Sequence, residues 1–378
     1  MTLWISAEYM MLQDKEGAVI SRTQSQRIAI YAVTHKGVEL ARTLAACCPA
    51  TLYMPERMLN SVETSSHVKG FSSLTACVTE TFHTTDAHLF ITATGIAVRA
   101  IAPHLRGKDI DPAVVVMDQA GRHVISLLSG HLGGANALAQ RLAEYIGGTA
   151  VITTATDTEQ LPSIDMLAQA AGCAIHSIQA IKHINGALLA GEQVLLDDPA
   201  DILGIKQQAY VSHFTLAEDA PFADADMPSV VVSWRTGASF EMHERTLLLH
   251  PKVLCAGIGS KRGVDATTVL ALLRTTCAAE NIAVESIRAL ASVDAKADEQ
   301  GIIDAAAELG VPFVTFPADQ LDAIAVPNPS DKPKTAVGTK SVAEAAALCC
   351  TQQHGNGQLL VEKRKGNGVT LAVALEIE

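Results

Sequence analysis

Short apolar runs alternate along the chain with polar turns and with segments of helical spacing. Residues 28–33 form one apolar run, and residues 38–46 follow it with apolar positions three and four apart. The run predicts a buried strand, and the spacing predicts an amphipathic helix. The order recurs where a strand ending at Ile91 is followed by Thr94 and Gly95, which open another predicted helix. Such alternation is typical of an α/β fold.

A hairpin and a glycine-rich loop come next. Residues 113–117 predict a strand, and the sequence Asp-Gln-Ala-Gly at 118–121 predicts a turn into a second strand at 122–126. Residues 129–136 read Ser-Gly-His-Leu-Gly-Gly-Ala-Asn and lead into a predicted helix at 137–145. A strand, a glycine-rich loop and a helix in this order continue the α/β pattern.

A new unit begins at Pro251. Residues 253–256 predict a strand, and Asp265 is the expected N-cap of a helix that extends to Cys277. Gly310 is expected to end a later helix, and the chain closes with a predicted strand pair. We therefore predict a multidomain α/β protein whose parallel or mixed sheets are flanked by helices, with an extension at 1–25, an N-terminal α/β domain at 26–148, a middle α/β domain at 149–246 and a separate C-terminal α/β domain at 250–378.

Composition narrows the possible partners. The 378 residues include 40 acidic and 28 basic side chains, a net charge of −12, which argues against nucleic acid and anionic membranes as partners. We find no uninterrupted apolar stretch of bilayer-spanning length. The eight cysteines form no CxxC pair, so we expect neither a zinc site nor a disulfide framework, and we expect reduced thiols in the cytoplasm.

The loop at 129–136 is the main candidate for chemistry. Its backbone N–H groups precede a helix, which suits a phosphate or carboxylate, although the loop could also be only a turn. His131 lies between glycines that offer its ring little packing, so we favour a functional role for it. The segment 153–157 directly follows a predicted strand, where α/β folds place ligands, but it could instead cap the next helix. The sequence has neither a P-loop nor a complete GxGxxG fingerprint, which argues against a nucleotide cofactor.

Several cations could bind a polycarboxylate. Arg99 lies among apolar residues of a predicted helix, with Arg106, Lys108 and Arg122 near it in the sequence. Arg99 could be a surface charge, but a cluster of this kind suits a ligand with several carboxylates.

Seven blocks of sequence resemble the cobalt-precorrin-5A hydrolase family. In the first half these blocks are 94–99, 111–116, 127–136 and 151–157, and in the last domain they are 257–263, 294–299 and 338–348. The block Leu-Leu-Ser-Gly-His-Leu-Gly-Gly-Ala-Asn at 127–136 is the most specific. The resemblance extends over about residues 26–378 and is weakest at 160–246. Ser260 stands where many relatives carry a cysteine, so we do not expect an obligatory nucleophile there.

The resemblance implies a hydrolase of anaerobic cobalamin (vitamin B12) biosynthesis. Members of this family open the δ-lactone of a corrinoid ring and release acetaldehyde, giving cobalt-precorrin-5B. It implies no cofactor, because the cobalt belongs to the substrate, and neighbouring pathway enzymes are candidate partners. For this reaction we expect His131 to act as the base. Asp157 or Thr154 would orient the histidine or the water, and the N–H groups of Gly133 and Gly134 would donate to the oxyanion. The expected substrate-binding residues are Thr94, Gly95, Arg99, Arg122, Ser129, Gly130, Gly133, Gly134, Asn136, Thr153, Lys261 and Arg262, and no metal ligands are expected.

Two other functions stay open. The last domain resembles a small protein that occurs alone in the oxygen-requiring pathway, so the chain could be a corrinoid-binding or handover protein without catalysis. A methyltransferase of the same pathway fits less well, because the sequence shows no glycine-rich site for a methyl donor. The His131 loop separates these options, since a carrier has no need of it.

Overall fold

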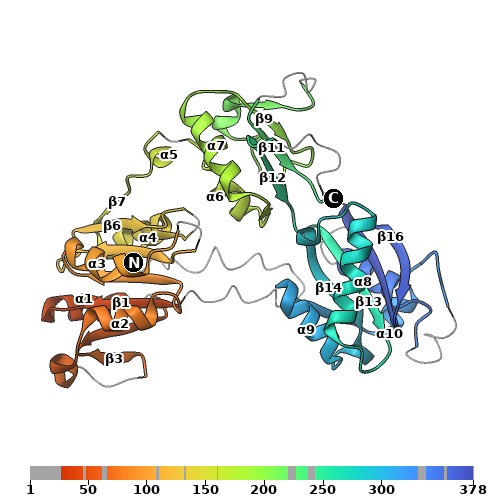
Figure 1. The fold of residues 1–378 in the computed structure, drawn as a ribbon, viewed down its shortest axis with the longest axis horizontal. Helices are drawn as coiled ribbons and strands as arrows, with labels where there is room; N and C mark the ends of the chain where they lie inside the picture. Colours follow the sequence, from red (N-terminus) through yellow and green to blue (C-terminus); the bar gives the residue numbers. More distant parts are fainter. Residues whose placement is uncertain are drawn as a thin grey trace, which may run out of the picture. The chain divides into compact units, whose positions relative to one another are not determined.

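The computed structural model describes residues 27–45, 48–61, 66–107, 110–131, 133–159, 161–219, 227–236, 243–330, 338–352 and 356–377. The chain divides into two compact units, Met1–Ser163 and Ile164–Glu378. Among the described residues, the first unit contains one β-sheet and the second contains two, each flanked by helices (Figure 1). This architecture confirms the predicted multidomain α/β class.

A seven-stranded sheet with the order β3-β2-β1-β4-β5-β6-β7 organises the first unit. Helices α1 and α4 pack on one face of the sheet, and α2 and α3 pack on the other. The apolar residues of the central strands β1, β4 and β5 alternate between these two cores, as expected for strands covered on both faces. The elements are β1 (Ile28–Ala32), α1 (His35–Ala45), β2 (Ala50–Pro55), η1 (Glu56–Ser61), β3 (Val68–Phe71), α2 (Leu74–Thr81), β4 (Ala87–Ile91), α3 (Thr94–Ile101), η2 (Ala102–His104), β5 (Ala113–Met117), β6 (His123–Leu128), α4 (Ala135–Ile146), β7 (Thr149–Val151) and α5 (Ala155–Thr158).

The predicted hairpin between β5 and β6 is confirmed, and it reverses the strand direction within the sheet. Strands β1 to β5 are parallel, whereas β6 is antiparallel to β5 and β7 is parallel to β6. Asp118 forms the turn, because its carboxylate accepts hydrogen bonds from the N–H groups of Ala120 and His123, each at 2.8 Å. Since β7 pairs with β6, the first unit continues past residue 148, where the sequence analysis placed a boundary.

The middle sheet has the order β10-β9-β11-β12-β8. Its strands are parallel except for β8, which is antiparallel to β12. The elements are α6 (Ile164–Ala170), β8 (Ala174–Ile175), α7 (Ile178–Leu189), β9 (Val194–Asp197), η3 (Ala209–His213), β10 (Phe214–Leu216), β11 (Ser229–Val232) and β12 (Thr246–His250).

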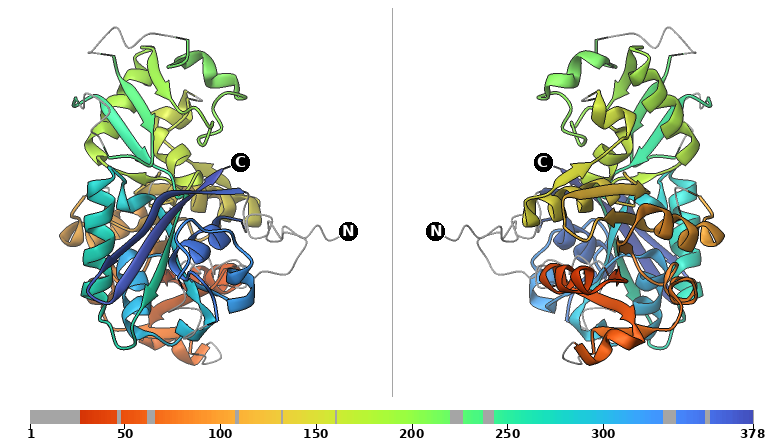
Figure 2. Two further views of the ribbon diagram at one scale, coloured as in Figure 1. Left: turned by 90° about the vertical axis from the view of Figure 1, so that its right-hand side faces the viewer. Right: turned by 90° about the vertical axis from the view of Figure 1, so that its left-hand side faces the viewer.

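The last sheet has the order β15-β14-β13-β17-β16, with α8 and α9 on one face and α10 and α12 on the other. The predicted closing strand pair is present, and Figure 2 shows it in dark blue. The expected caps are also found: the Asp265 carboxylate accepts from Thr268 N–H at 2.7 Å, and Gly310 ends α9 with φ 65°. The elements are β13 (Leu254–Ser260), α8 (Ala266–Ala279), η5 (Val284–Ser286), β14 (Ile287–Val293), η6 (Asp294–Lys296), α9 (Gln300–Leu309), β15 (Phe313–Phe316), α10 (Ala318–Asp322), α12 (Ala343–Gln352), β16 (Asn356–Gly366) and β17 (Val369–Ile377).

Among the helices of the described residues, none combines the length and the apolar character needed to cross a bilayer.

Candidate active site

The loop that follows β6 is held in a tight and partly strained conformation. Ser129 adopts φ 56°, a left-handed conformation that side chains other than glycine rarely adopt, and its hydroxyl donates to the carbonyl of Asp111 at 2.8 Å. Gly134 has φ 83°, and a Cβ on Gly133 would lie 2.4 Å from the Cβ of Ser129. Gly133 and Gly134 therefore adopt a backbone conformation and packing that leave no room for a side chain at 133 and disfavour one at 134. Backbone strain such as that at Ser129 is concentrated at functional sites.

His131 is half-buried in this loop, and hydroxyl groups contact both of its ring nitrogens. Ser163 Oγ lies 2.9 Å from Nδ1, and Thr156 Oγ1 lies 3.4 Å from Nε2. Thr156 belongs to α5, and Ser163 lies 32 residues after the histidine. The ring is thus held by two segments outside its own loop, which gives it a fixed orientation.

Asn136 organises the other side of the loop. Its buried amide accepts a hydrogen bond from Ser126 Oγ at 2.6 Å and donates one to Thr154 Oγ1 at 3.0 Å. Gly130 packs so closely on this amide that a Cβ there would lie 2.6 Å from the amide oxygen. Asn136 therefore connects β6, the start of α4 and the segment after β7.

Two expected roles change in the structure. Thr154, expected to orient His131 or the water, accepts a hydrogen bond from Asn136, and Thr156 in the helical turn beginning at Ala155 contacts the ring. The role of Thr154 toward the water stays a prediction. Gly134 was expected to donate to an oxyanion, but its N–H donates to the carbonyl of His131 at 2.8 Å. Gly133 N–H makes no hydrogen bond within the described part of the chain, and its expected donor role stays a prediction.

The predicted binding residues of the first unit divide between opposite edges of the sheet. Because β6 runs antiparallel to β5, Leu128 pairs with Val114, and the His131 loop lies where β1 to β5 begin. Thr94 and Gly95 follow the end of β4, at the other edge. A five-residue strand separates these edges by about 17 Å.

The two cations of this set lie at the edge away from His131. Arg122 directly precedes β6 and is exposed. Arg99 is exposed as well, and its Nη1 donates to the carbonyl of Gly95 at 3.0 Å, which turns its charge toward the start of α3. The structure therefore does not gather Thr94, Gly95, Arg99 and Arg122 around the histidine.

Of the first-unit arginines singled out in the sequence analysis, Arg106 lies on the His131 edge. The buried carboxylate of Asp111 accepts hydrogen bonds from the N–H groups of Arg106 at 3.0 Å and Gly107 at 3.1 Å. The carbonyl of Asp111 in turn accepts the hydroxyl of Ser129. Asp111 thus fixes the backbone of an exposed arginine beside the loop. Lys108, the neighbouring candidate, lies outside the described residues.

The predicted cations of the last domain follow β13. Lys261 and Arg262 are both exposed, and Lys261 N–H donates to the carbonyl of Gly368 at 2.9 Å. Arg262 forms an ion pair with Asp298 at 3.5 Å and lies 3.8 Å from the buried carboxylate of Glu299. The charge of Arg262 is therefore already partly compensated.

Thr153 is exposed after β7, at the same edge as His131, whereas the side chain of Asp157 lies outside the described residues.

The sequence analysis missed three residues of this cluster. No motif marks Ser163, and the contacts of Asp111 and Ser126 join positions that are distant in sequence. It also missed the division between the two edges. The signal for that division was the predicted hairpin at 118–121, because a hairpin reverses the strand after which the loop begins.

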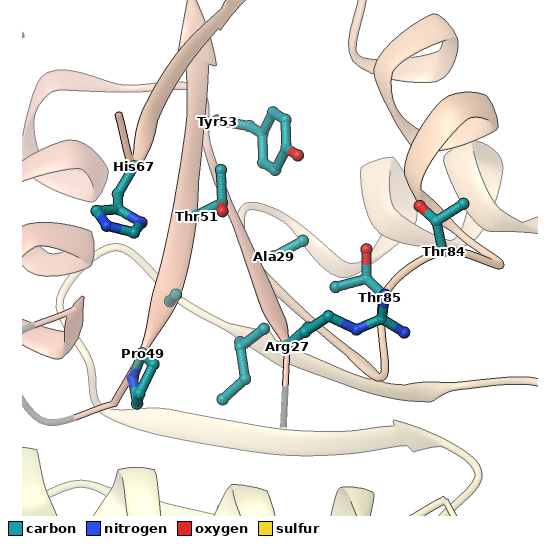
Figure 3. Close-up of a pocket in the computed structure, with 10 residues that line it drawn as sticks. Arg27, Ala29, Pro49, Thr51, Tyr53, His67, Thr84 and Thr85 are labelled. Atoms are coloured by element: carbon teal, nitrogen blue, oxygen red, sulfur yellow. The ribbon is translucent and has the colours of Figure 1, made fainter. Parts of the chain in front are cut away.

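A pocket of about 320 Å³ opens where β1 and β2 begin (Figure 3). Thr51, Thr84 and Thr85 give it a polar lining, together with Arg27. Arg27 is already paired with Asp86 at 3.0 Å. The pocket contains no residue of the His131 loop, and the candidate site is the hydrogen-bonded cluster around His131.

Known proteins similar to this chain align over nearly all of its length. The cobalt-precorrin-5A hydrolase of Salmonella typhimurium is 34% identical over 361 residues, which cover 94% of this chain and 99% of that protein. The chain belongs to the cobalt-precorrin-5A hydrolase family. The enzyme of the same name from Priestia megaterium is 30% identical over 383 residues, covering 97% of this chain and 99% of the relative.

Family models divide this cobalt-precorrin-5A hydrolase family member in three. Residues 76–157 match the model described as cobalamin synthesis G N-terminal, 162–251 match the cobalamin biosynthesis central region, and 254–374 match the cobalamin synthesis G C-terminus. The His131 loop lies in the first match and Ser163 in the second. The protein CobE of Sinorhizobium is 35% identical over 126 residues, covering 32% of this chain and 79% of that protein.

Proposed function

We propose that this chain is a cobalt-precorrin-5A hydrolase that opens the ring δ-lactone and releases acetaldehyde to give cobalt-precorrin-5B. The main support is the alignment over nearly the whole length with two relatives of that name. A second support is His131, which lies in the most specific motif of the family. Its imidazole contacts two hydroxyl groups and could act as a general base in ester hydrolysis.

His131 is the proposed base. In the tautomer with its proton on Nδ1, the ring donates to Ser163 Oγ, and the lone pair of Nε2 points toward the side of Thr156. Nε2 then takes a proton from water while the water oxygen adds to the lactone carbonyl. The N–H of Gly133 is the proposed donor to the developing oxyanion. When the tetrahedral intermediate collapses, the departing alkoxide takes the proton back from Nε2.

The same nitrogen serves the second step. The released hydroxyl loses its proton to Nε2, the carbon–carbon bond to the ring breaks, and acetaldehyde leaves while the ring keeps the electron pair. One base can therefore act in both steps, because the first step returns it to its neutral form.

The substrate supplies the cobalt, and the proposed reaction uses no nucleotide and no added metal. The corrinoid carries several carboxylates, and Arg106, exposed beside the His131 loop, is the cation proposed to bind one of them. We propose that the protein acts in the cytoplasm and exchanges corrinoids with neighbouring enzymes of the pathway.

Anaerobic incubation with cobalt-precorrin-5A, in the presence of a chelator, tests the proposal through acetaldehyde release. His131→Ala and His131→Asn should lose about 10² to 10⁴ in rate while binding the corrinoid as the parent does, because neither variant can accept the proton. His123→Asn is the matched control, since His123 is exposed at the other edge of the sheet. Full activity of either His131 variant would contradict the role of the base.

The same experiment distinguishes hydrolysis from a corrinoid-handover function without catalysis. The similarity of the last domain to CobE keeps this function as the second candidate. A parent protein that binds the lactone corrinoid and releases no acetaldehyde would support handover and would contradict the hydrolase proposal.

A further inference from the structure

Two buried cysteines of the last domain, far apart in sequence, lie side by side. Cys255 is on β13 and Cys350 is on α12, and their Sγ atoms are 2.7 Å apart. Both are free thiols, with exposed fractions of 0% and 3%. A disulfide bond requires about 2.05 Å between its sulfurs. A small shift of the two side chains would therefore bring them to bonding distance.

The packing of α12 on β13 explains this proximity. A Cβ on Gly257 would lie 1.9 Å from the carbonyl oxygen of Ala343, so the helix backbone rests directly on the strand. Cys255 precedes Gly257 by two positions and faces the same side of the strand. Cys350 follows Ala343 by seven positions, two helical turns, and lies on the same side of the helix. The glycine contact thus brings the two thiols together.

A β-bulge adds a positive charge to the pair. The register between β13 and β14 shifts between Leu254 and Cys255, and Arg288 is the extra residue of β14 at this point. Its Nη2 lies 3.6 Å from Cys255 Sγ and 3.4 Å from the carbonyl of Cys350. The guanidinium also pairs with Glu376 and is 23% exposed, so the cluster lies close to the surface.

The two thiols have different acidities. The hydrogen bond between the two thiols and the nearby charge of Arg288 lower the pKa of Cys255. The same hydrogen bond, together with burial, raises the pKa of Cys350. Since the thiolate is the reactive form of cysteine, Cys255 is the nucleophile of the pair.

We propose that Cys255 and Cys350 form a redox-active dithiol that a small peroxide oxidises to a disulfide joining β13 to α12. The Cys255 thiolate attacks one oxygen of hydrogen peroxide, the O–O bond breaks, and the departing hydroxide takes a proton to become water, which leaves a sulfenic acid. Cys350 sulfur then attacks Cys255 sulfur, the S–O bond breaks, and a second water leaves. Two thiols are oxidised and one peroxide is reduced, and the chemistry is independent of the hydrolase reaction.

Peptide mapping of the intact protein tests this proposal. After hydrogen peroxide treatment and tryptic digestion without reductant, we expect peptides 253–261 and 341–363 as one linked species, about 2 Da lighter than their sum. Cys349→Ser is the matched control, because Cys349 is buried beside Cys350 and should not be needed for the link. A link lost in Cys349→Ser, or both peptides recovered as thiols from the treated parent, would overturn the proposal.

Trapping of the intermediate tests the assignment of the nucleophile. In Cys350→Ser the sulfenic acid of Cys255 has no partner, so dimedone added during unfolding should label Cys255. The reciprocal Cys255→Ser should leave Cys350 unlabelled. Arg288→Gln should slow the oxidation of Cys255 about tenfold, because it removes the charge that favours the thiolate. Dimedone on Cys350 rather than Cys255, or an unchanged rate in Arg288→Gln, would refute this assignment.

Discussion

Ser163 offers the sharpest test of how the histidine works. Its hydroxyl lies 2.9 Å from His131 Nδ1, and Ser163→Ala removes this contact. If the serine only orients the ring, the variant loses one neutral hydrogen bond, which is worth about 0.5 to 1.5 kcal/mol. That loss corresponds to a decrease of about 2- to 13-fold in kcat. If Ser163 instead attacked the lactone itself, its removal would cost roughly 10⁴-fold or more.

Single-turnover acetaldehyde release under anaerobic conditions separates these outcomes. We expect the small decrease in Ser163→Ala, an unchanged KM, and recovery in Ser163→Thr, which restores the hydroxyl. Ser73→Ala is the matched control: it removes the N-cap hydroxyl that accepts from Ala76 N–H in α2, and it should lower stability without lowering kcat. A decrease beyond about 10³-fold in Ser163→Ala would refute the orienting role in favour of a nucleophile. Parent activity would show that the contact has no catalytic role.

Three further predictions follow from the geometry of the first unit. Arg106→Ala should weaken corrinoid binding by about 1 to 3 kcal/mol, and Arg122→Ala, at the other edge of the sheet, should not; equal affinities in a titration would contradict this difference. Gly134→Ala should cost about 1 to 2 kcal/mol and lower kcat, because φ 83° disfavours a side chain, whereas Gly147→Ala, with φ 69° at the other end of α4, should cost as much stability and keep kcat. Burial lowers the pKa of His88 to about 4, so the unfolded state binds a proton more tightly and the first unit should lose about 2 kcal/mol of stability between about pH 7 and pH 5. Pulse proteolysis should detect this loss in the parent and not in His88→Gln, and equal losses in both would refute the assignment.

The sequence by itself determined the local structure and the family. Apolar runs predicted β1, β5 and β13, because a buried strand needs apolar residues whatever its neighbours are. Asp265 and Gly310 predicted helix ends, because capping depends on residues that are close in sequence. The motif at 127–136 indicated the family and marked His131 as the candidate base.

Only the tertiary structure decided which residues meet. The reversal at Asp118 places the His131 loop at one edge of the sheet and Arg122 at the other, although only the six residues of β6 lie between them in sequence. The contact of Ser163 with His131 spans 32 residues, and that of Cys255 with Cys350 spans 95. No local pattern encodes such pairs, because they depend on strand direction and on the close packing of whole elements.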